Sequence, residues 1–195
     1  ASLATTNDFT GDKQAQELII GAPEFNGGTG KVYIVFGSRQ IPSVIDLVNG
    51  TEDHYEIVGE NPGDNFGFSV SQGSGVTNGR GVFIVGAPFY SSETGRVYVF
   101  KGGDLERNIE VPAANAKAIF TGQQAGGLFG FDIALLGEID GGSDEFGVGA
   151  PELGRAYVIF GKNDLKGRDL ATDTTDVLIL EGSAGIGKTT LWQAG

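Results

Sequence analysis

The sequence predicts an all-β protein made of short strands joined by tight turns. Glycine is unusually frequent, with 34 of 195 residues, and it follows neither a collagen period nor a low-complexity pattern. Between the glycines lie short apolar runs rich in β-branched and aromatic residues, as at 31–36, 82–87 and 154–160. Sustained helical periodicity is hard to find outside 113–118 and the C-terminal residues. We therefore expect strands throughout and minimal helix.

The composition excludes several classes of function. The chain has 25 acidic and 13 basic residues and a net charge of -12, so it repels a phosphate backbone. It contains no cysteine, which removes disulfides, thiolate metal sites and cysteine nucleophiles. No apolar stretch is long enough to span a bilayer as a helix. We expect no nucleic-acid partner and no membrane insertion.

Four landmarks recur along the chain and place each strand. A Phe-Gly pair opens the first strand of a unit, at 66–67 and 129–130. Gly-Ala-Pro closes the second strand, at 21–23, 86–88 and 149–151. A glycine, a basic residue, an apolar residue and a tyrosine open the third strand, at 30–33, 95–98 and 154–157. A glycine ends the fourth strand, at Gly59, Gly122 and Gly182. A fixed order of four strands per repeat follows.

These landmarks predict the strands in order. The first unit opens near Ser2 and continues with strands at 17–22, 31–36 and 54–58. The second unit has strands at 66–72, 82–87, 95–101 and 116–120, and the third at 131–136, 145–149, 154–160 and 177–181. The units cover about 2–59, 66–122 and 129–182. Residues 183–195 are either the innermost strand of a next unit or a truncated phosphate-binding loop.

A four-stranded unit of this length cannot bury both faces alone, and radial stacking of such sheets gives a β-propeller. The landmarks resemble the FG-GAP repeat of integrin α-subunit propellers and their bacterial relatives. The resemblance covers essentially the whole chain. It implies an FG-GAP β-propeller with about three four-stranded blades present, as part of a larger propeller. The missing blades would come from the same chain or from another protomer.

The resemblance also implies calcium in the turn between the first and second strands of a blade, where oxygens at alternate positions hold one cation. In the first turn, Asp8, Thr10 and Asp12 fill positions 1, 3 and 5 of the loop, and Gln16 falls at position 9. Lys13 stands where the pattern has glycine and brings a positive charge. Weakly bound calcium and an ordinary solvated turn remain equal alternatives.

The other two turns differ from the first. The third turn is one residue shorter than the pattern but carries Glu138, Asp140 and Asp144, with Glu145 directly after them. Carboxylates so close repel one another without a counter-ion, so a calcium site and a plain acidic turn are again both open. The middle turn has Arg80 in place of an acidic ligand, and we expect no cation there.

The segment 182–189 matches the phosphate-binding loop G-x-x-x-x-G-K-[ST]. Its candidate nucleotide-binding residues are Gly182, Gly187, Lys188 and Thr189. Such a loop also needs a following helix, a magnesium-binding aspartate on a second strand and a parallel sheet. Only seven residues follow Lys188, and the segment is also in register with the propeller repeat. A fusion, a truncation or a coincidence would each explain the match.

No catalytic arrangement stands out in the sequence. The single histidine, His54, has no cysteine or second histidine to pair with and is expected at the surface. The leading hypothesis is a non-catalytic extracellular or cell-surface binding module for a protein or a glycan, with possible weak calcium binding. The alternatives are a structural assembly unit completed by another chain, or a fragment of an enzyme or ATPase using the loop at 182–189.

Overall fold

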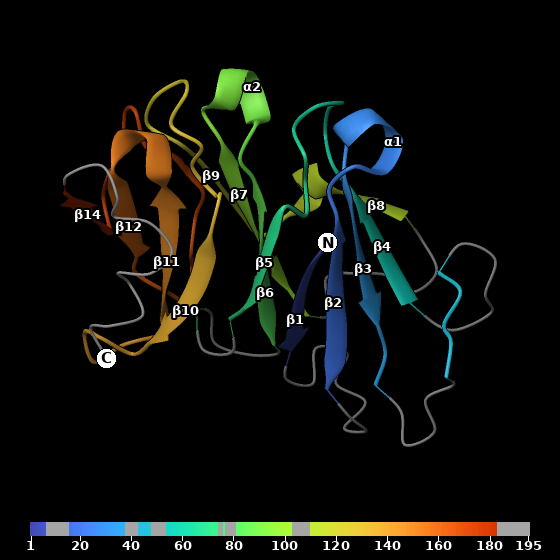
Figure 1. The fold of residues 1–195 in the computed structure, drawn as a ribbon. Helices are drawn as coiled ribbons and strands as arrows, with labels where there is room; N and C mark the ends of the chain where they lie inside the picture. The colour runs from blue at the N-terminus through green and yellow to red at the C-terminus, as the bar shows by residue number, and fades with distance from the viewer. Residues whose placement is uncertain are drawn as a thin grey trace.

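The computed structural model contains three mainly antiparallel sheets arranged side by side (Figure 1). It describes residues 1–6, 16–37, 43–47, 54–73, 76, 81–102 and 110–182. Within them the helical pieces are single turns: α1 (Phe25–Gly28), α2 (Tyr90–Glu93), η1 (Ala113–Asn115) and η2 (Pro151–Leu153). The predicted all-β, propeller-like architecture is confirmed.

Each sheet holds one four-stranded unit, called a blade here, whose strands pair in chain order. Blade 1 consists of β1 (Ser2–Thr6), β2 (Glu17–Ala22), β3 (Lys31–Val35) and β4 (His54–Val58). Blade 2 consists of β5 (Ser69–Gln72), β6 (Val82–Ala87), β7 (Arg96–Lys101) and β9 (Ala118–Thr121). Blade 3 consists of β10 (Ile133–Gly137), β11 (Glu145–Ala150), β12 (Arg155–Ile159) and β14 (Val177–Glu181).

Strand ends differ from the predicted ones where the backbone turns. The strand predicted at 66–72 begins only at Ser69, because Gly67 has φ +86° and Phe66 makes a single isolated bridge to Gly30. The same shift moves the start of the strand predicted at 131–136 to Ile133, beyond Gly130 with φ +91°. The helical pattern at 113–118 gives only the short η1 turn.

Two short strands join neighbouring blades and were not predicted. β8 (Glu110–Pro112) lies in the connection between β7 and β9 of blade 2 and pairs in parallel with β4 of blade 1. β13 (Arg168–Asp169), in the connection between β12 and β14 of blade 3, pairs in parallel with β9 of blade 2. Blades 2 and 3 therefore each add a strand to the outer edge of the preceding blade, which removes an exposed edge.

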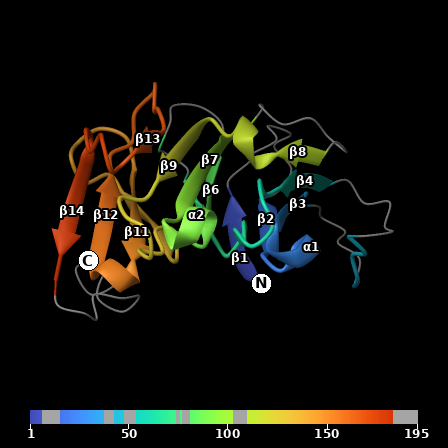
Figure 2. The same ribbon diagram turned by 90° about the horizontal axis from the view of Figure 1, so that it is seen from above.

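The hydrophobic core lies between the blades. Seen from above, the three sheets follow one another in an arc with β14 at one end (Figure 2). Blade 2 is covered on both sides, and every residue of β6 is buried. One core cluster joins blades 1 and 2 and the other joins blades 2 and 3. Phe66 meets Tyr98 edge-on at 5.2 Å between ring centroids, and Phe129 meets Tyr157 in the same way at 5.1 Å.

Each Phe-Gly turn is held by two residues of the preceding blade, which we call the junction pair. In blade 1 the pair is Ser2 and Gly21, which face each other in the sheet, and the Ser2 hydroxyl donates to the Gly67 carbonyl at 2.8 Å. A Cβ on Gly21 would lie 2.1 Å from that carbonyl oxygen. The absence of a side chain at Gly21 is therefore what lets the next blade approach.

Candidate functional site

The tight turns α1 and α2 and the linkers between blades lie at one end of the molecule, which we call the loop face (Figure 1). Each linker is hydrogen-bonded to the turn of the blade before it. The Gly63 and Asn65 amides donate to the carbonyls of Gly27 and Gly28 at 3.1 and 2.7 Å. At the next junction, the Gly126 amide donates to the Ser92 carbonyl at 3.0 Å. The loops of this face are therefore fixed by main-chain contacts.

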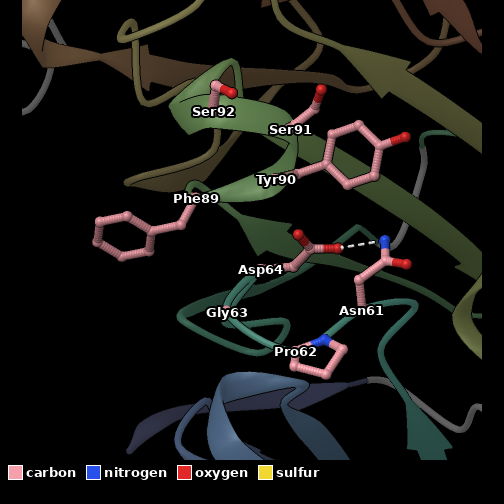
Figure 3. A pocket seen from close by; sticks show the side chains of 8 residues that line it. All are labelled: Asn61, Pro62, Gly63, Asp64, Phe89, Tyr90, Ser91 and Ser92. Atoms are coloured by element: carbon pink, nitrogen blue, oxygen red, sulfur yellow. Dashed lines mark hydrogen bonds between the residues drawn. The ribbon is translucent and has the colours of Figure 1, made fainter.

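A groove opens on the loop face between the linker after blade 1 and the α2 turn of blade 2 (Figure 3). Its volume of about 500 Å³ is in the range of small-ligand sites. The groove combines a carboxylate, an amide, three hydroxyls and two aromatic rings. It is lined by Asn61, Pro62, Gly63, Asp64, Phe89, Tyr90, Ser91 and Ser92.

Asp64 is the charged group of this groove. It is only 6% exposed, and its Oδ2 accepts a hydrogen bond from the Asn61 amide at 2.9 Å. The main chain of Asn61 also contributes a hydrogen bond to this carboxylate. Burial raises the pKa of Asp64, while the hydrogen bond from Asn61 works against that rise. A carboxylate in this state gains from a hydrogen-bond donor or a cation entering the groove.

The groove's aromatic wall is positioned by a triad beneath it, consisting of Glu60, Arg96 and Tyr98. Glu60 Oε1 accepts hydrogen bonds from Arg96 Nη1 at 2.8 Å and from the Tyr98 hydroxyl at 2.6 Å. The Arg96 guanidinium lies 3.6 Å from the centre of the Tyr90 ring. Burial, and then the charge and hydrogen bond of Glu60, raise the pKa of Tyr98 far above its usual range.

The same triad recurs at the next junction with a neutral acceptor. Gln123 Oε1 accepts hydrogen bonds from Arg155 Nη1 at 2.9 Å and from the Tyr157 hydroxyl at 3.1 Å. The recurring tyrosines of the third strands therefore connect one blade to the linker that follows the preceding blade.

The acidic turn at 138–145 contains a fully buried carboxylate. Glu145 is 0% exposed, and its Oε2 accepts a hydrogen bond from the Ile139 amide at 2.6 Å. Its Oε1 has no hydrogen-bond partner in the described structure. Burial raises the pKa of Glu145, and the charges of Asp140 and Asp144 add to the rise. Such an orphaned buried oxygen suits a cation ligand.

The structure describes only some of the predicted site residues. Glu138, Asp140 and Asp144 lie in the exposed or half-buried turn before β11, and Gln16 is exposed beside β2. No three acidic or histidine side chains among the described residues gather closely enough to share a metal ion. Gly182 directly follows β14. The other candidates lie outside the described residues: Asp8, Thr10, Asp12, Arg80, Gly187, Lys188 and Thr189.

His54 lies in an ion-pair cluster, not in a catalytic one. Its side chain is 16% exposed, and Nε2 lies 3.0 Å from Glu56 Oε1. Glu56 Oε2 accepts from Lys31 Nζ at 2.6 Å, and Lys31 also reaches Glu110 of β8 at 3.0 Å. The expected surface histidine is thus partly enclosed beside the contact between blades 1 and 2.

Sequence reasoning did not identify the groove. One signal was present: Asp64 breaks the repeat, because the equivalent position in the next linker, counted from Gly59 and Gly122, is Gly127. An acidic residue in only one copy of a structural repeat is not required by the fold.

No protein-family model matches the chain. It is 30% identical over 152 residues to integrin α-5 of Xenopus laevis, covering 72% of this chain. It is 30% identical over 153 residues to human integrin α-IIb, covering 74% of this chain. It is also 34% identical over 87 residues to mouse phosphatidylinositol-glycan-specific phospholipase D, covering 43% of this chain. These matches span 13%, 13% and 10% of the relatives' own lengths.

None of the helices in the described ranges has both the length and the apolar character needed to cross a bilayer.

Proposed function

We propose that this chain, which carries an integrin-α-like β-propeller region, is a non-catalytic adhesion module at the cell surface or outside the cell. Its ligand is a protein with a basic side chain that enters the groove between blades 1 and 2. The integrin relatives support the adhesion class and the location. They match only 13% of the relatives' length, so the ligand is argued from this chain's own groove.

The observation that carries the proposal is the buried carboxylate of Asp64 beside a fixed aromatic wall. A guanidinium or ammonium entering the groove would give the buried Asp64 carboxylate a charge-assisted hydrogen bond. Tyr90 already holds the Arg96 guanidinium against its ring, and the hydroxyls of Ser91 and Ser92 supply acceptors nearby. The net charge of -12 favours the approach of a basic partner at long range.

The groove proposal is tested by titration with N-acetyl-arginine amide and with its uncharged citrulline counterpart, followed by amide NMR shifts. We expect saturable shifts at 61–64 and 89–92 with the arginine probe only, and loss of binding in Asp64→Asn. Asp164→Asn, an exposed aspartate of blade 3, is the matched control. Equal binding of both probes, or full binding by Asp64→Asn, would refute the role of the charge. A glycan that binds equally well to Asp64→Asn would assign the site to a different ligand class.

Weak calcium binding is part of the same proposal. The first turn offers Asp8, Thr10, Asp12 and Gln16, and the third offers Glu138, Asp140 and Asp144. Support comes from Glu145, whose orphaned Oε1 lies beside the third turn. A bound calcium ion would neutralise these carboxylates, and the residues of the turn would hold it through their oxygens.

A further inference from the structure

The α2 turn, which forms one wall of the groove between blades 1 and 2, has a left-handed backbone. Ser91, Ser92 and Glu93 have φ of +47°, +57° and +63°. This conformation is unfavourable for a residue with a Cβ atom, and it normally occurs at single residues. Among the described residues, no other three successive residues without a glycine adopt it. The turn therefore keeps these side chains at a conformational cost.

The equivalent turn of blade 1 avoids this cost. Residues 26–28 of α1 correspond to residues 91–93, counted from the proline of Gly-Ala-Pro, and read Asn-Gly-Gly. The second and third carbonyls of each turn accept hydrogen bonds from the linker that follows the same blade, at 3.1 and 2.7 Å in α1 and at 3.0 and 2.8 Å in α2. The contact between turn and linker therefore requires the left-handed backbone, but not the side chains of Ser91 and Ser92.

Other departures from the repeat lie in the same groove. Asp64 stands where the next linker has Gly127, and Phe89 stands directly after Gly-Ala-Pro, where blades 1 and 3 have Glu24 and Glu152. Seven residues separate that proline from the arginine that opens the third strand in blade 2, and only three do so in blade 3. The fold requires none of these differences, so their concentration at one groove indicates a role in binding.

The two serines lie at the outer rim of the groove. In Figure 3 the Tyr90 ring lies between Asp64 and the two serines, and both serines are exposed. A long basic side chain whose charged end reaches Asp64 therefore passes along the Tyr90 ring, and the main chain that carries it remains at the rim. A serine hydroxyl both donates and accepts hydrogen bonds, which suits the N–H and C=O groups of a peptide.

We propose that Ser91 and Ser92 bind the main chain of the protein ligand, with their hydroxyls hydrogen-bonded to the peptide groups beside the basic residue that reaches Asp64. This inference rests on the function proposed above for the groove. It makes the ligand an extended peptide segment, because a free amine or guanidine has no peptide group for the serines to bind. It also explains why the turn keeps two serines where asparagine and glycine would be less strained.

Two probes separate the main-chain contacts from the charge. Propylguanidine carries the guanidinium of arginine without a peptide group, whereas N-acetyl-glycyl-arginyl-glycine amide carries both. In amide NMR titrations of the full chain, both probes should shift residues 61–64. The peptide should bind about two- to ten-fold more tightly, which is the range for one neutral hydrogen bond.

Two double variants then test the serines. Ser91→Ala with Ser92→Ala removes the hydroxyls and keeps the Cβ atoms, whereas Ser91→Gly with Ser92→Gly also removes the left-handed strain. Both variants should bring the affinity ratio of the two probes close to one and leave propylguanidine binding unchanged. Only the glycine variant should also raise the melting temperature, by about 2–4 °C. Gly27→Ser, whose Cβ would have no neighbour within 4 Å, is the matched control in α1 and should leave the ratio unchanged.

Equal affinities of the two probes for the unmodified chain would overturn the serine contacts while leaving the Asp64 site intact. An affinity ratio that the alanine variant does not lower would overturn them as well. A ratio lowered only in the glycine variant would assign the effect to the flexibility of the turn, against a role of the hydroxyls. Absence of binding by either probe would refute the function proposed for the groove, and the serine contacts with it.

Discussion

Tyr98 and Tyr157 occupy the same repeat position but donate to different acceptors, which makes their replacement by phenylalanine a matched test of the junction triads. The Tyr98 hydroxyl donates to the carboxylate of Glu60 at 2.6 Å, whereas the Tyr157 hydroxyl donates to the amide oxygen of Gln123 at 3.1 Å. Both side chains are fully buried, so replacing either tyrosine with phenylalanine would not open a gap that solvent could fill. The variants therefore differ mainly in the charge of the acceptor.

A hydrogen bond to a charged group contributes about 1.5–3 kcal/mol, and a neutral one about 0.5–1.5 kcal/mol. We expect Tyr98→Phe to lower the free energy of unfolding by about 2 kcal/mol and Tyr157→Phe by about 1 kcal/mol. In the Glu60→Gln background, which makes the first triad resemble the second, the cost of Tyr98→Phe should fall to that of Tyr157→Phe.

Urea unfolding followed by circular dichroism measures these differences, with the slope m checked for constancy. Equal losses for the two single variants would refute the reasoning. So would an unchanged cost of Tyr98→Phe in the Glu60→Gln background.

Four further predictions concern packing, calcium, pH and nucleotide. Gly86→Ala should lower the free energy of unfolding by at least about 1–3 kcal/mol, since its Cβ would lie 2.2 Å from a carbonyl oxygen of blade 3. Gly149→Ala, whose Cβ would meet nothing closer than 3.7 Å, should cost much less, and equal losses in urea would contradict the junction geometry. Calorimetric titration should give a calcium Kd of about 10⁻⁴–10⁻³ M, and Glu145→Gln should weaken this binding. The same substitution should raise the free energy of unfolding of the calcium-free protein, because the pKa of Glu145 is raised in the folded state. No calcium heat at millimolar concentration, with an unchanged melting temperature, would end the calcium proposal. Burial acts to raise the pKa of Glu56, but the hydrogen bonds from Lys31 and His54 outweigh it and hold that pKa below its usual value. The stability from this cluster is therefore complete above the unfolded pKa of about 4.3 and is lost as the pH falls through the folded value, and unfolding curves of Glu56→Gln should lack that loss. Finally, ATP should not bind the chain in equilibrium dialysis, and ATP binding that Lys188→Ala abolishes would establish a nucleotide site.

Much of the fold could be predicted from the sequence, because each strand of the repeat is defined by residues close together in the chain. β2, β4, β6 and β14 lie where the landmarks predicted them, since each is an apolar run ended by glycine or Gly-Ala-Pro. The Phe-Gly turns were recognised as well, although the positive φ of Gly67 delays the start of β5. The candidate site was read less well, because its carboxylates were sought in the calcium turns and not in a linker.

The sequence by itself determined the strands, their order and the apolar faces, because each of these depends on residues close together in the chain. Only the tertiary structure showed the contacts between different blades. In it, β8 and β13 extend the sheet of the preceding blade, Glu60 accepts a hydrogen bond from Tyr98 across a junction, and Asp64 lies buried in a groove between two blades. These features depend on the distance and burial of groups that are far apart in sequence. Such distances follow from how closely the blades stack at glycines such as Gly21 and Gly86, and no local pattern encodes them.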